Sequence, residues 1–277
     1  MKPSLTVIIL TLNEALHLER CLESVRGIAS EIMVVDSGST DGTQEIARRC
    51  GATVVEHAFT NQADQFNWAL DTVPLSGAWV LRLDADEYLL PELAREIEAA
   101  CASVPSDVTG LYLKRRVYFM GRWIRHGGYY PTWILRLFRR GKARSENREV
   151  DEHITLLAGR AEELQNDFVD ENLKGLGFWF RKHHDYAARE AAAVLRGAHV
   201  DAGALGGGQA AWKRRAKESF YYRLPPFLRP LLYFLYRYVL RFGFLDGVRG
   251  SLFHLLQGFW YRFLVDVNIW KRRLHLA

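Results

Sequence analysis

The stretch Trp79-Val-Leu-Arg-Leu-Asp-Ala-Asp-Glu87 decides the fold, because an apolar run ends there in three carboxylates before Pro91 opens a helical segment. The apolar part predicts a buried central strand, since interior strands of a parallel sheet are almost continuously apolar. Side chains alternate along a strand, so Asp84 and Asp86 are expected on one side of its carboxyl end. Two such carboxylates repel each other unless a cation lies between them, and they suit Mg²⁺ or Mn²⁺ with a diphosphate. The alternative is that they only cap a turn.

The composition is that of a globular protein. The chain has 277 residues, of which 49% are hydrophobic and 25% charged, enough for one large or two small domains with a real core. The three cysteines, Cys21, Cys50 and Cys101, lack metal-type spacing and are expected as free thiols in a reducing compartment. The first residues have no small-residue cleavage site and predict a strand rather than a signal peptide.

Strands and helices alternate along the first part of the chain. The ranges 5–11, 31–36, 53–55 and 79–84 predict strands, with helices between them, and this alternation indicates βαβ units and a parallel sheet. Because the carboxyl ends of parallel strands share one edge, the polar residues that follow three of these strands are expected to surround one site. Carboxylates there could accept ribose hydroxyls or the imide N–H of uracil. The residues concerned are Asn13, Glu14, Asp36, Asp84 and Asp86.

Three motifs carry a resemblance to a known family. Thr11-Leu-Asn-Glu14, Val34-Val-Asp-Ser-Gly-Ser-Thr-Asp-Gly-Thr43 and Leu83-Asp-Ala-Asp-Glu87 resemble, in order and spacing, those of family 2 glycosyltransferases with the GT-A fold. The resemblance implies a nucleotide-sugar donor, inversion at the anomeric carbon and a divalent metal held by Asp84 and Asp86. It also implies a nucleotide-sugar site formed by Thr11, Asn13, Glu14, Asp36, Ser37, Gln65, Asp84 and Ala85.

One position departs from the family pattern, and two others extend the resemblance. Ser37 stands where many members of the family have a second Asp. Gln65 and Asn67 resemble the Gln-x-Asn-x-Ala-Leu helix that lies near the donor in bacterial members. The alternative for these two residues is a helix surface that makes only local hydrogen bonds.

The middle of the chain predicts the acceptor half. Strands are expected at 108–119 and 133–138, and a loop rich in glycine and aromatic residues, 121–131, lies between them. Aromatic platforms beside Arg and His are a common way to hold sugar rings and phosphates. We therefore predict acceptor binding, with a purely structural loop as the alternative, for Trp123, His126, Tyr130 and Arg136.

The segment Asn147–His153 supplies candidates for a catalytic base. An inverting transfer needs a group that removes the proton of the attacking hydroxyl, and a mixed environment raises the pKa of such a carboxylate. The resemblance favours Glu152 first and Asp151 second. The alternative is that Glu152 is a surface partner of Arg148.

The resemblance also implies a metal ligand located beyond the base. His183 and His184 are neighbours on a predicted helix and lie about 100° apart around its axis, so at most one of them faces the site. We choose His183. Further on, 201–208 is rich in glycine and is interpreted as a flexible hinge.

The C-terminal region is strongly basic. From Ala211 onward thirteen Lys and Arg stand against three acidic residues, so the preceding chain is net acidic. Its longest stretch without charged side chains, 250–261, has twelve residues, and a helix needs about 20 to span a bilayer. Dense Tyr, Trp and Phe with recurring Arg are typical of helices in the membrane interface. A soluble helical hairpin is the alternative; nucleic-acid binding is not expected of so apolar a segment.

Parts of this region resemble the tails of bacterial glycosyltransferases of the lipopolysaccharide-core and exopolysaccharide pathways, including the core β-1,4-glucosyltransferases. They are Pro226–Leu232, Gly243–Gly247 and Gln257–Asp266. We therefore expect a GT-A-type Rossmann-like mixed sheet with flanking helices and a membrane-associated amphipathic helical tail. The expected segments are a donor half at 1–107, an acceptor half with the base at 108–200, and a linker with the tail at 201–277.

The expected activity is metal-dependent inverting transfer of a hexose from a UDP-sugar, with UDP-glucose as the implied donor. The acceptor would be a lipid-linked glycan at the anionic cytoplasmic face of a bacterial inner membrane, with Mn²⁺ or Mg²⁺ as cofactor. One rival is a polyprenyl-phosphate glycosyl synthase, which would share the donor half. The other is a non-catalytic protein that binds a nucleotide sugar as a scaffold.

Overall fold

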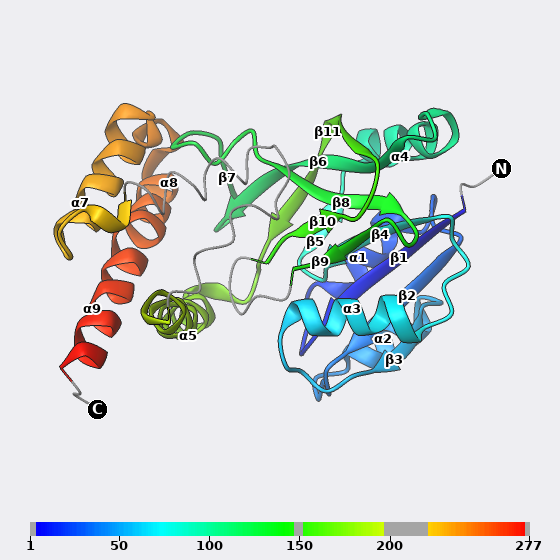
Figure 1. The fold of residues 1–277 in the computed structure, drawn as a ribbon, viewed down its shortest axis with the longest axis horizontal. Coiled ribbons are helices and arrows are strands. Elements are labelled where there is room, and N and C mark those ends of the chain that lie inside the picture. Colours follow the sequence, from blue (N-terminus) through cyan, green and yellow to red (C-terminus); the bar gives the residue numbers. More distant parts are fainter. Residues whose placement is uncertain (1–3, 147–151, 197–220, 275–277) are drawn as a thin grey trace. The chain divides into compact units, whose positions relative to one another are not determined.

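The computed structural model describes residues 4–146, 152–196 and 221–274 (Figure 1). Packing divides the chain into two compact units. Unit 1 comprises Met1–Arg115 and Trp133–Leu173, and unit 2 comprises Arg116–Thr132 and Lys174–Ala277. The loop 116–132 packs with the C-terminal region in unit 2, and the donor and acceptor segments 1–107 and 108–200 stay a prediction. The predicted linker at 201–208 lies outside the described residues.

Unit 1 is built on a mixed sheet. Four strands are parallel, in the order β3 (Thr53–Glu56), β2 (Glu31–Asp36), β1 (Leu5–Thr11) and β4 (Trp79–Asp84). Antiparallel strands continue the sheet from β4, in the order β8 (Trp133–Arg139), β6 (Val108–Phe119), β11 (Arg160–Glu171) and β5 (Glu87–Leu89). A separate ribbon pairs β9 (Ala143–Ser145) with β10 (Ile154–Leu156). The predicted parallel sheet is confirmed for its first half and becomes antiparallel after β4.

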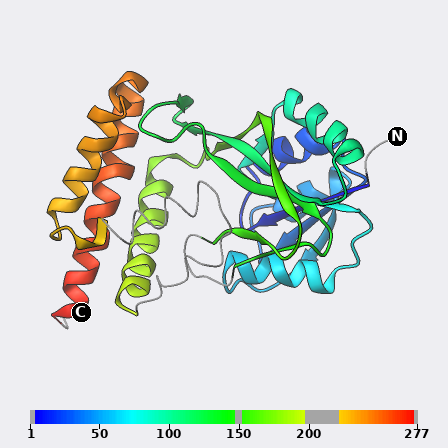
Figure 2. The same ribbon diagram turned by 45° about the horizontal axis from the view of Figure 1, so that its top comes forward.

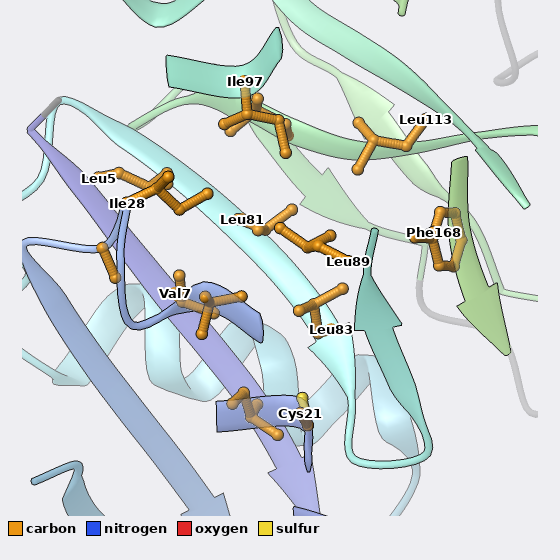
Figure 3. Close-up of a cluster of buried hydrophobic side chains, with 14 of the residues drawn as sticks. Leu5, Val7, Cys21, Ile28, Leu81, Leu83, Leu89, Ile97, Leu113 and Phe168 are labelled. Carbon is orange, nitrogen blue, oxygen red and sulfur yellow. The ribbon is translucent and has the colours of Figure 1, made fainter. Parts of the chain in front are cut away.

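The central strands are buried on both faces. Every residue of β1 is buried. The helices α1 (Leu18–Val25), α2 (Thr43–Arg49) and α4 (Pro91–Ser103) cover one face, and α3 (Gln62–Thr72) covers the other. Figure 3 shows the first layer, where Leu5, Leu81 and Ile97 meet. This double burial explains why the strands are mostly apolar, with Thr6 of β1 and Arg82 of β4 as buried polar exceptions.

Unit 2 is predominantly helical. Its one strand among the described residues, β7 (Arg122–Ile124), forms a hairpin with the end of β6. The long helix α5 (Gly175–Leu195) lies alongside α9 (Tyr261–Arg273), with Ala187 and Val265 in their shared core (Figure 2). Between them in sequence come α7 (Leu228–Leu235), α8 (Gly247–Phe253) and shorter turns, including π-helical turns at 236–240 and 254–260.

The C-terminal region is therefore folded onto the loop that precedes it in sequence. Phe253 and Leu256 pack against Phe119 and Ile124 in one apolar cluster. The predicted helical region is confirmed, and in the described ranges it contains no helix with both the length and the apolar character that a bilayer crossing demands. Several of its arginines also face protein: Arg229 pairs with buried Asp266 at 2.8 Å.

Candidate donor site

The carboxyl ends of three parallel strands lie level with one another. The register pairs Thr11 of β1 with Asp36 of β2, and Leu10 of β1 with Asp84 of β4. The polar segments that follow these strands therefore start at one edge of the sheet, next to one another. Ligands bind at this edge in open α/β sheets. The convergence expected from the sequence is present in the structure.

Asp36 organises the loop that follows β2. It is fully buried, and its carboxylate accepts hydrogen bonds from the Thr11 hydroxyl (2.7 Å), the Ser39 hydroxyl (2.5 Å) and the Ser39 N–H (2.8 Å). Gly38 N–H and Gln44 Nε2 complete the set at 3.0 and 2.9 Å. Burial alone would raise the pKa of Asp36, but these bonds hold it below its ordinary value. In this conformation Asp36 shapes the loop, and its contact with a nucleoside stays a prediction.

Asp36 also takes part in hydrogen bonds that differ from those expected at the start of α2. Asp41 and Gln44 predict a capping box for α2, yet the N-cap is Gly42, with no side-chain cap. Gln44 instead donates to Asp36, as described above. Ser37 beside it has a buried hydroxyl oxygen without a hydrogen-bond partner in the described part of the chain, which is consistent with a group that awaits a ligand.

The loop after β1 is bound to the same turn. Asn13 has a positive φ of 56°, and its side chain accepts the N–H of Thr40 at 2.8 Å. Glu14 accepts a hydrogen bond from Nδ1 of His17 at 2.6 Å, while Nε2 of the same ring accepts the N–H of Leu173 at 2.8 Å. These roles fix a neutral His17 with its proton on Nδ1. His17 is fully buried and was not singled out from the sequence.

The Asp-x-Asp segment is a turn and not a continuation of the strand. β4 ends at Asp84, and Ala85 and Asp86 turn the chain into β5. The alternation argument that placed Asp84 and Asp86 on one side is therefore wrong for this segment. Ala85 is buried in the core, and Asp86 accepts a hydrogen bond from Nδ2 of Asn172 at 3.0 Å. Asn172 follows β11 and was missed from the sequence.

Arginine side chains balance the charge of these carboxylates. Arg136 on β8 lies 3.1 Å from Asp84 and 2.5 Å from Glu87. Arg82 lies 3.4 Å from the other Asp84 oxygen. Burial raises the pKa of Glu87 to about 8, with Arg136 opposing the rise and Asp84 adding to it. Arg136 was predicted to bind the acceptor, but in the structure it is buried and serves as counter-ion to two acids.

Asp84 and Asp86 can hold a metal ion only together with ligands from a substrate. Across the described ranges, no three His, Cys, Asp or Glu side chains are arranged to hold an ion. Mg²⁺ and Mn²⁺ commonly take one or two carboxylates and complete their shell with phosphate oxygens and water. Asp84, with 26% of its side chain exposed, and the half-buried Asp86 fit this requirement.

Gln65 and Asn67 make structural hydrogen bonds. Gln65 is buried and donates to the carbonyl of Val35 at 2.8 Å. Asn67 forms two bonds with the backbone of Ser145 on β9, at 2.9 and 3.0 Å. These bonds join distant segments of the chain, so they differ from the local bonds of the alternative. A donor contact of Gln65 stays a prediction.

The candidates for the base lie beside a part of the chain that is not described. Asp151 lies outside the described residues. Glu152 is half-buried, next to the point where the Glu146 N–H donates to the His153 carbonyl at 2.9 Å. The strands β9 and β10 pair next to Glu152, and the role of Glu152 stays a prediction.

The remaining predicted site residues belong to unit 2. Trp123 and Tyr130 meet edge to face, with ring centres 5.0 Å apart, and His126 pairs with Asp246 at 2.7 Å. His183 stacks on Trp179 and donates from Nδ1 to its carbonyl oxygen at 2.9 Å. Burial lowers the pKa of His183 to about 4, so its ring is neutral at physiological pH. Its role as a metal ligand stays a prediction.

A mixed sheet whose parallel half ends in this acidic edge defines the GT-A class of nucleotide-sugar-dependent enzymes. The chain belongs to glycosyl transferase family 2, since the sequence model of that family matches residues 6–165. Among solved structures, a mannosyltransferase from Pyrobaculum calidifontis in complex with GDP-Man and Mn²⁺ aligns over 100% of this chain and 87% of its own. It is 19% identical with a TM-score of 0.52, which confirms the predicted fold.

Curated relatives include several bacterial glycosyltransferases. An uncharacterized glycosyltransferase of Rickettsia bellii is 43% identical over 103 residues, or 37% of this chain and 34% of the relative. The lipopolysaccharide core biosynthesis glycosyltransferase LpsC of Rhizobium meliloti is 35% identical over 153 residues, or 52% of this chain and 53% of the relative. A PGL/p-HBAD biosynthesis glycosyltransferase of Mycobacterium bovis is 35% identical over 150 residues, or 50% and 56%. The chain thus spans about a third to a half of the length of these relatives.

Proposed function

We propose that the protein is a metal-dependent inverting glycosyltransferase that moves a hexose from a UDP-sugar, with UDP-glucose favoured, to a lipid-linked glycan. The observation that carries the proposal is the level register of Thr11, Asp36 and Asp84 at one sheet edge. Membership of family 2 and relatives such as LpsC support a place in lipopolysaccharide or exopolysaccharide synthesis.

Each group of residues at this edge of the sheet has a separate role. The loop Thr11–Glu14 and the turn held by Asp36 bind the nucleoside. Asp84 and Asp86 hold the metal–diphosphate, and Arg136 keeps the Asp84 carboxylate in place. Glu152, or Asp151, removes the proton of the acceptor hydroxyl as that oxygen attacks the anomeric carbon from the face opposite the diphosphate. The bond to the diphosphate breaks with its electron pair, so the configuration inverts.

A divalent metal fits this site. When bound, Mn²⁺ or Mg²⁺ would neutralise the charge that develops on the departing diphosphate. The mannosyltransferase from Pyrobaculum calidifontis was solved with Mn²⁺, which supports the same cofactor here.

The proposed location is the cytoplasmic face of a bacterial inner membrane. Large apolar side chains are exposed along the C-terminal helices, including Val248 at 88% and Leu240 at 68%. Exposed apolar surface of this kind marks interaction sites. Arg241 and Arg249 are exposed among these residues and would contact anionic headgroups.

Substitution of the Asp-x-Asp segment tests the proposal. Asp86→Ala is expected to lower hexose transfer at least 100-fold, because the diphosphate loses a carboxylate that holds its counter-ion. The thermal denaturation midpoint should change little, since Asp86 is half-buried and makes one side-chain bond. The matched control is Glu98→Ala on the exposed face of α4, which should retain full activity. Wild-type transfer unchanged by a chelator would contradict the metal role.

The sequence also predicts a rival acceptor class. A polyprenyl-phosphate glycosyl synthase would use the same donor half, and product analysis separates the two activities. The proposal requires a new glycosidic linkage, whereas the rival yields a sugar on a lipid monophosphate. Donor binding without transfer to any acceptor would instead indicate a scaffold.

A further inference from the structure

Three consecutive residues at the end of β11, Glu171, Asn172 and Leu173, contact the loops that follow both β1 and β4. The N–H of Glu171 donates to the carbonyl of Asp86 at 3.0 Å, and Nδ2 of Asn172 donates to the Asp86 carboxylate at 3.0 Å. The N–H of Leu173 donates to Nε2 of His17 at 2.8 Å. All of these residues belong to unit 1. The end of β11 therefore joins two of the loops at the donor edge of the sheet.

His17 extends this contact to Glu14. The imidazole is fully buried, and its Nδ1–H donates to the Glu14 carboxylate at 2.6 Å while its Nε2 accepts the N–H of Leu173. Because both ring nitrogens are engaged, the ring cannot turn without losing a hydrogen bond. The Glu14 side chain is 18% exposed, so its carboxylate reaches the surface in an orientation that His17 helps to fix.

A separate set of contacts holds the end of β11 in place. Arg20 donates from Nη1 to the Glu171 carboxylate at 2.6 Å and from Nη2 to the Glu171 carbonyl at 3.0 Å. β11 also pairs with β5. Substitution of the His17 or Asn172 side chain leaves these contacts intact, so it should change the orientation of a carboxylate and not the path of the backbone.

We propose that His17 and Asn172 are positioning residues of the donor site, His17 for the nucleoside through Glu14 and Asn172 for the divalent metal through Asp86. The inference rests on the proposed function and assigns two residues to its donor site. A hydrogen-bond partner that orients a metal ligand commonly changes metal affinity by about 10–100-fold. A carboxylate that is already fixed also loses less conformational freedom when a ligand binds. The two residues should therefore act on different components of donor binding.

Calorimetric titration of the full chain with UDP, with and without Mn²⁺, tests the two roles separately. His17→Leu removes both hydrogen bonds of the ring and should weaken UDP binding about tenfold under both conditions, because the Glu14 carboxylate loses its fixed orientation. In the wild type, Mn²⁺ should tighten UDP binding. Asn172→Ala should reduce that tightening about tenfold and leave the metal-free affinity for UDP unchanged.

A conservative variant and two matched controls separate positioning from a loss of structure. The amide of His17→Gln can donate to Glu14 and accept the N–H of Leu173, so this variant should recover most of the UDP affinity that His17→Leu loses. Glu23→Ala on α1 and Gln165→Ala on β11 change exposed side chains and should bind UDP as the wild type does.

The outcomes distinguish this inference from the donor site itself. Wild-type affinities in both His17→Leu and Asn172→Ala would overturn the inference and leave the donor site standing. Equal losses in these two variants, with and without Mn²⁺, would indicate a general disruption and would also overturn it. If His17→Leu does not fold, an unchanged effect of Mn²⁺ in Asn172→Ala would still do so. A wild type that binds no UDP would contradict the donor site and the inference together.

Discussion

At the scale of single residues, the acidic edge of the sheet depends on one arginine. Arg136 contacts both Asp84 and Glu87 and is itself buried. Burial opposes the charge of Arg136, but the two carboxylates raise its pKa above the ordinary value. The Glu87 carboxylate also accepts the Asp84 N–H at 2.9 Å. The conformation of the Asp-x-Asp turn is thus coupled to a charge on β8.

Removal of that charge should destabilise unit 1. Arg136→Met removes the guanidinium that contacts both Asp84 and Glu87, and it is expected to lower the free energy of unfolding by about 3–5 kcal/mol, measured by urea denaturation. Glu87→Gln keeps the acceptor for the Asp84 N–H, so the double variant should recover part of the loss. A double variant no more stable than Arg136→Met would contradict this account.

The loss of stability caused by Arg136→Met should depend on pH. Folded Glu87 holds its proton more tightly than the unfolded chain does, so its burial favours folding below the unfolded pKa. This contribution is lost as the pH rises through the folded pKa, near 8 in the wild type. Without Arg136 the pKa of Glu87 rises further, and the stability gap between wild type and Arg136→Met should be wider at pH 8.5 than at pH 5.

At the scale of elements, the sequence predicted the strands well, because β-branched apolar runs such as Leu5–Thr11 have no alternative to burial in a sheet. It also predicted that Asp36 and Asp84 share an edge. It did not predict the partners of these residues. Arg136 is 52 positions from Asp84, and no local pattern reports such a contact. The predicted strand 79–84 coincides with β4, but the alternation of side chains was carried on to Asp86, which lies in the turn after it.

The loop of unit 2 offers an element-scale prediction. A Cβ on Gly127, whose φ is +65°, would lie 2.3 Å from Cε1 of His254, whereas on Gly128, with φ +74°, its nearest neighbour would lie at 3.6 Å. Gly128→Ala should therefore cost only the left-handed backbone penalty, about 1–2 kcal/mol. Gly127→Ala should cost roughly 1–3 kcal/mol more through overpacking. Thermal denaturation of the two variants provides the comparison, and equal losses would contradict the packing.

At the scale of the whole molecule, the tail combines an interior role with an exposed apolar surface. The sequence predicted that arginines in the tail would reach toward lipid. In the structure Arg229 pairs with Asp266, and Arg237 lies 3.7 Å from the centre of the Tyr129 ring. Spacing along a helix could not distinguish these inward arginines from the exposed ones, because their partners lie in distant segments.

The exposed apolar surface leads to a prediction on membrane binding. Leu245→Ser with Val248→Ser should reduce cosedimentation with phosphatidylglycerol vesicles at least tenfold, since full burial of such a side chain is worth about 1.5–3 kcal/mol. Phe59→Ser with Leu157→Ser, two exposed apolar residues of unit 1, forms the control. Equal vesicle binding by the wild type and the first variant would contradict a membrane role for this surface.

Unit 2 consists of two separate segments of the chain, and this makes the protein difficult to divide into fragments. The hairpin 116–132 lies in the sequence between the two segments of unit 1, yet its apolar side chains Phe119 and Ile124 are covered by Phe253 and Leu256. A fragment that ends at Leu173 would retain the hairpin but lose the residues that bury its apolar side chains. The exposed apolar surface would then favour self-association. No single truncation therefore yields unit 1 without an exposed apolar surface. The hairpin must also be replaced by a short polar turn.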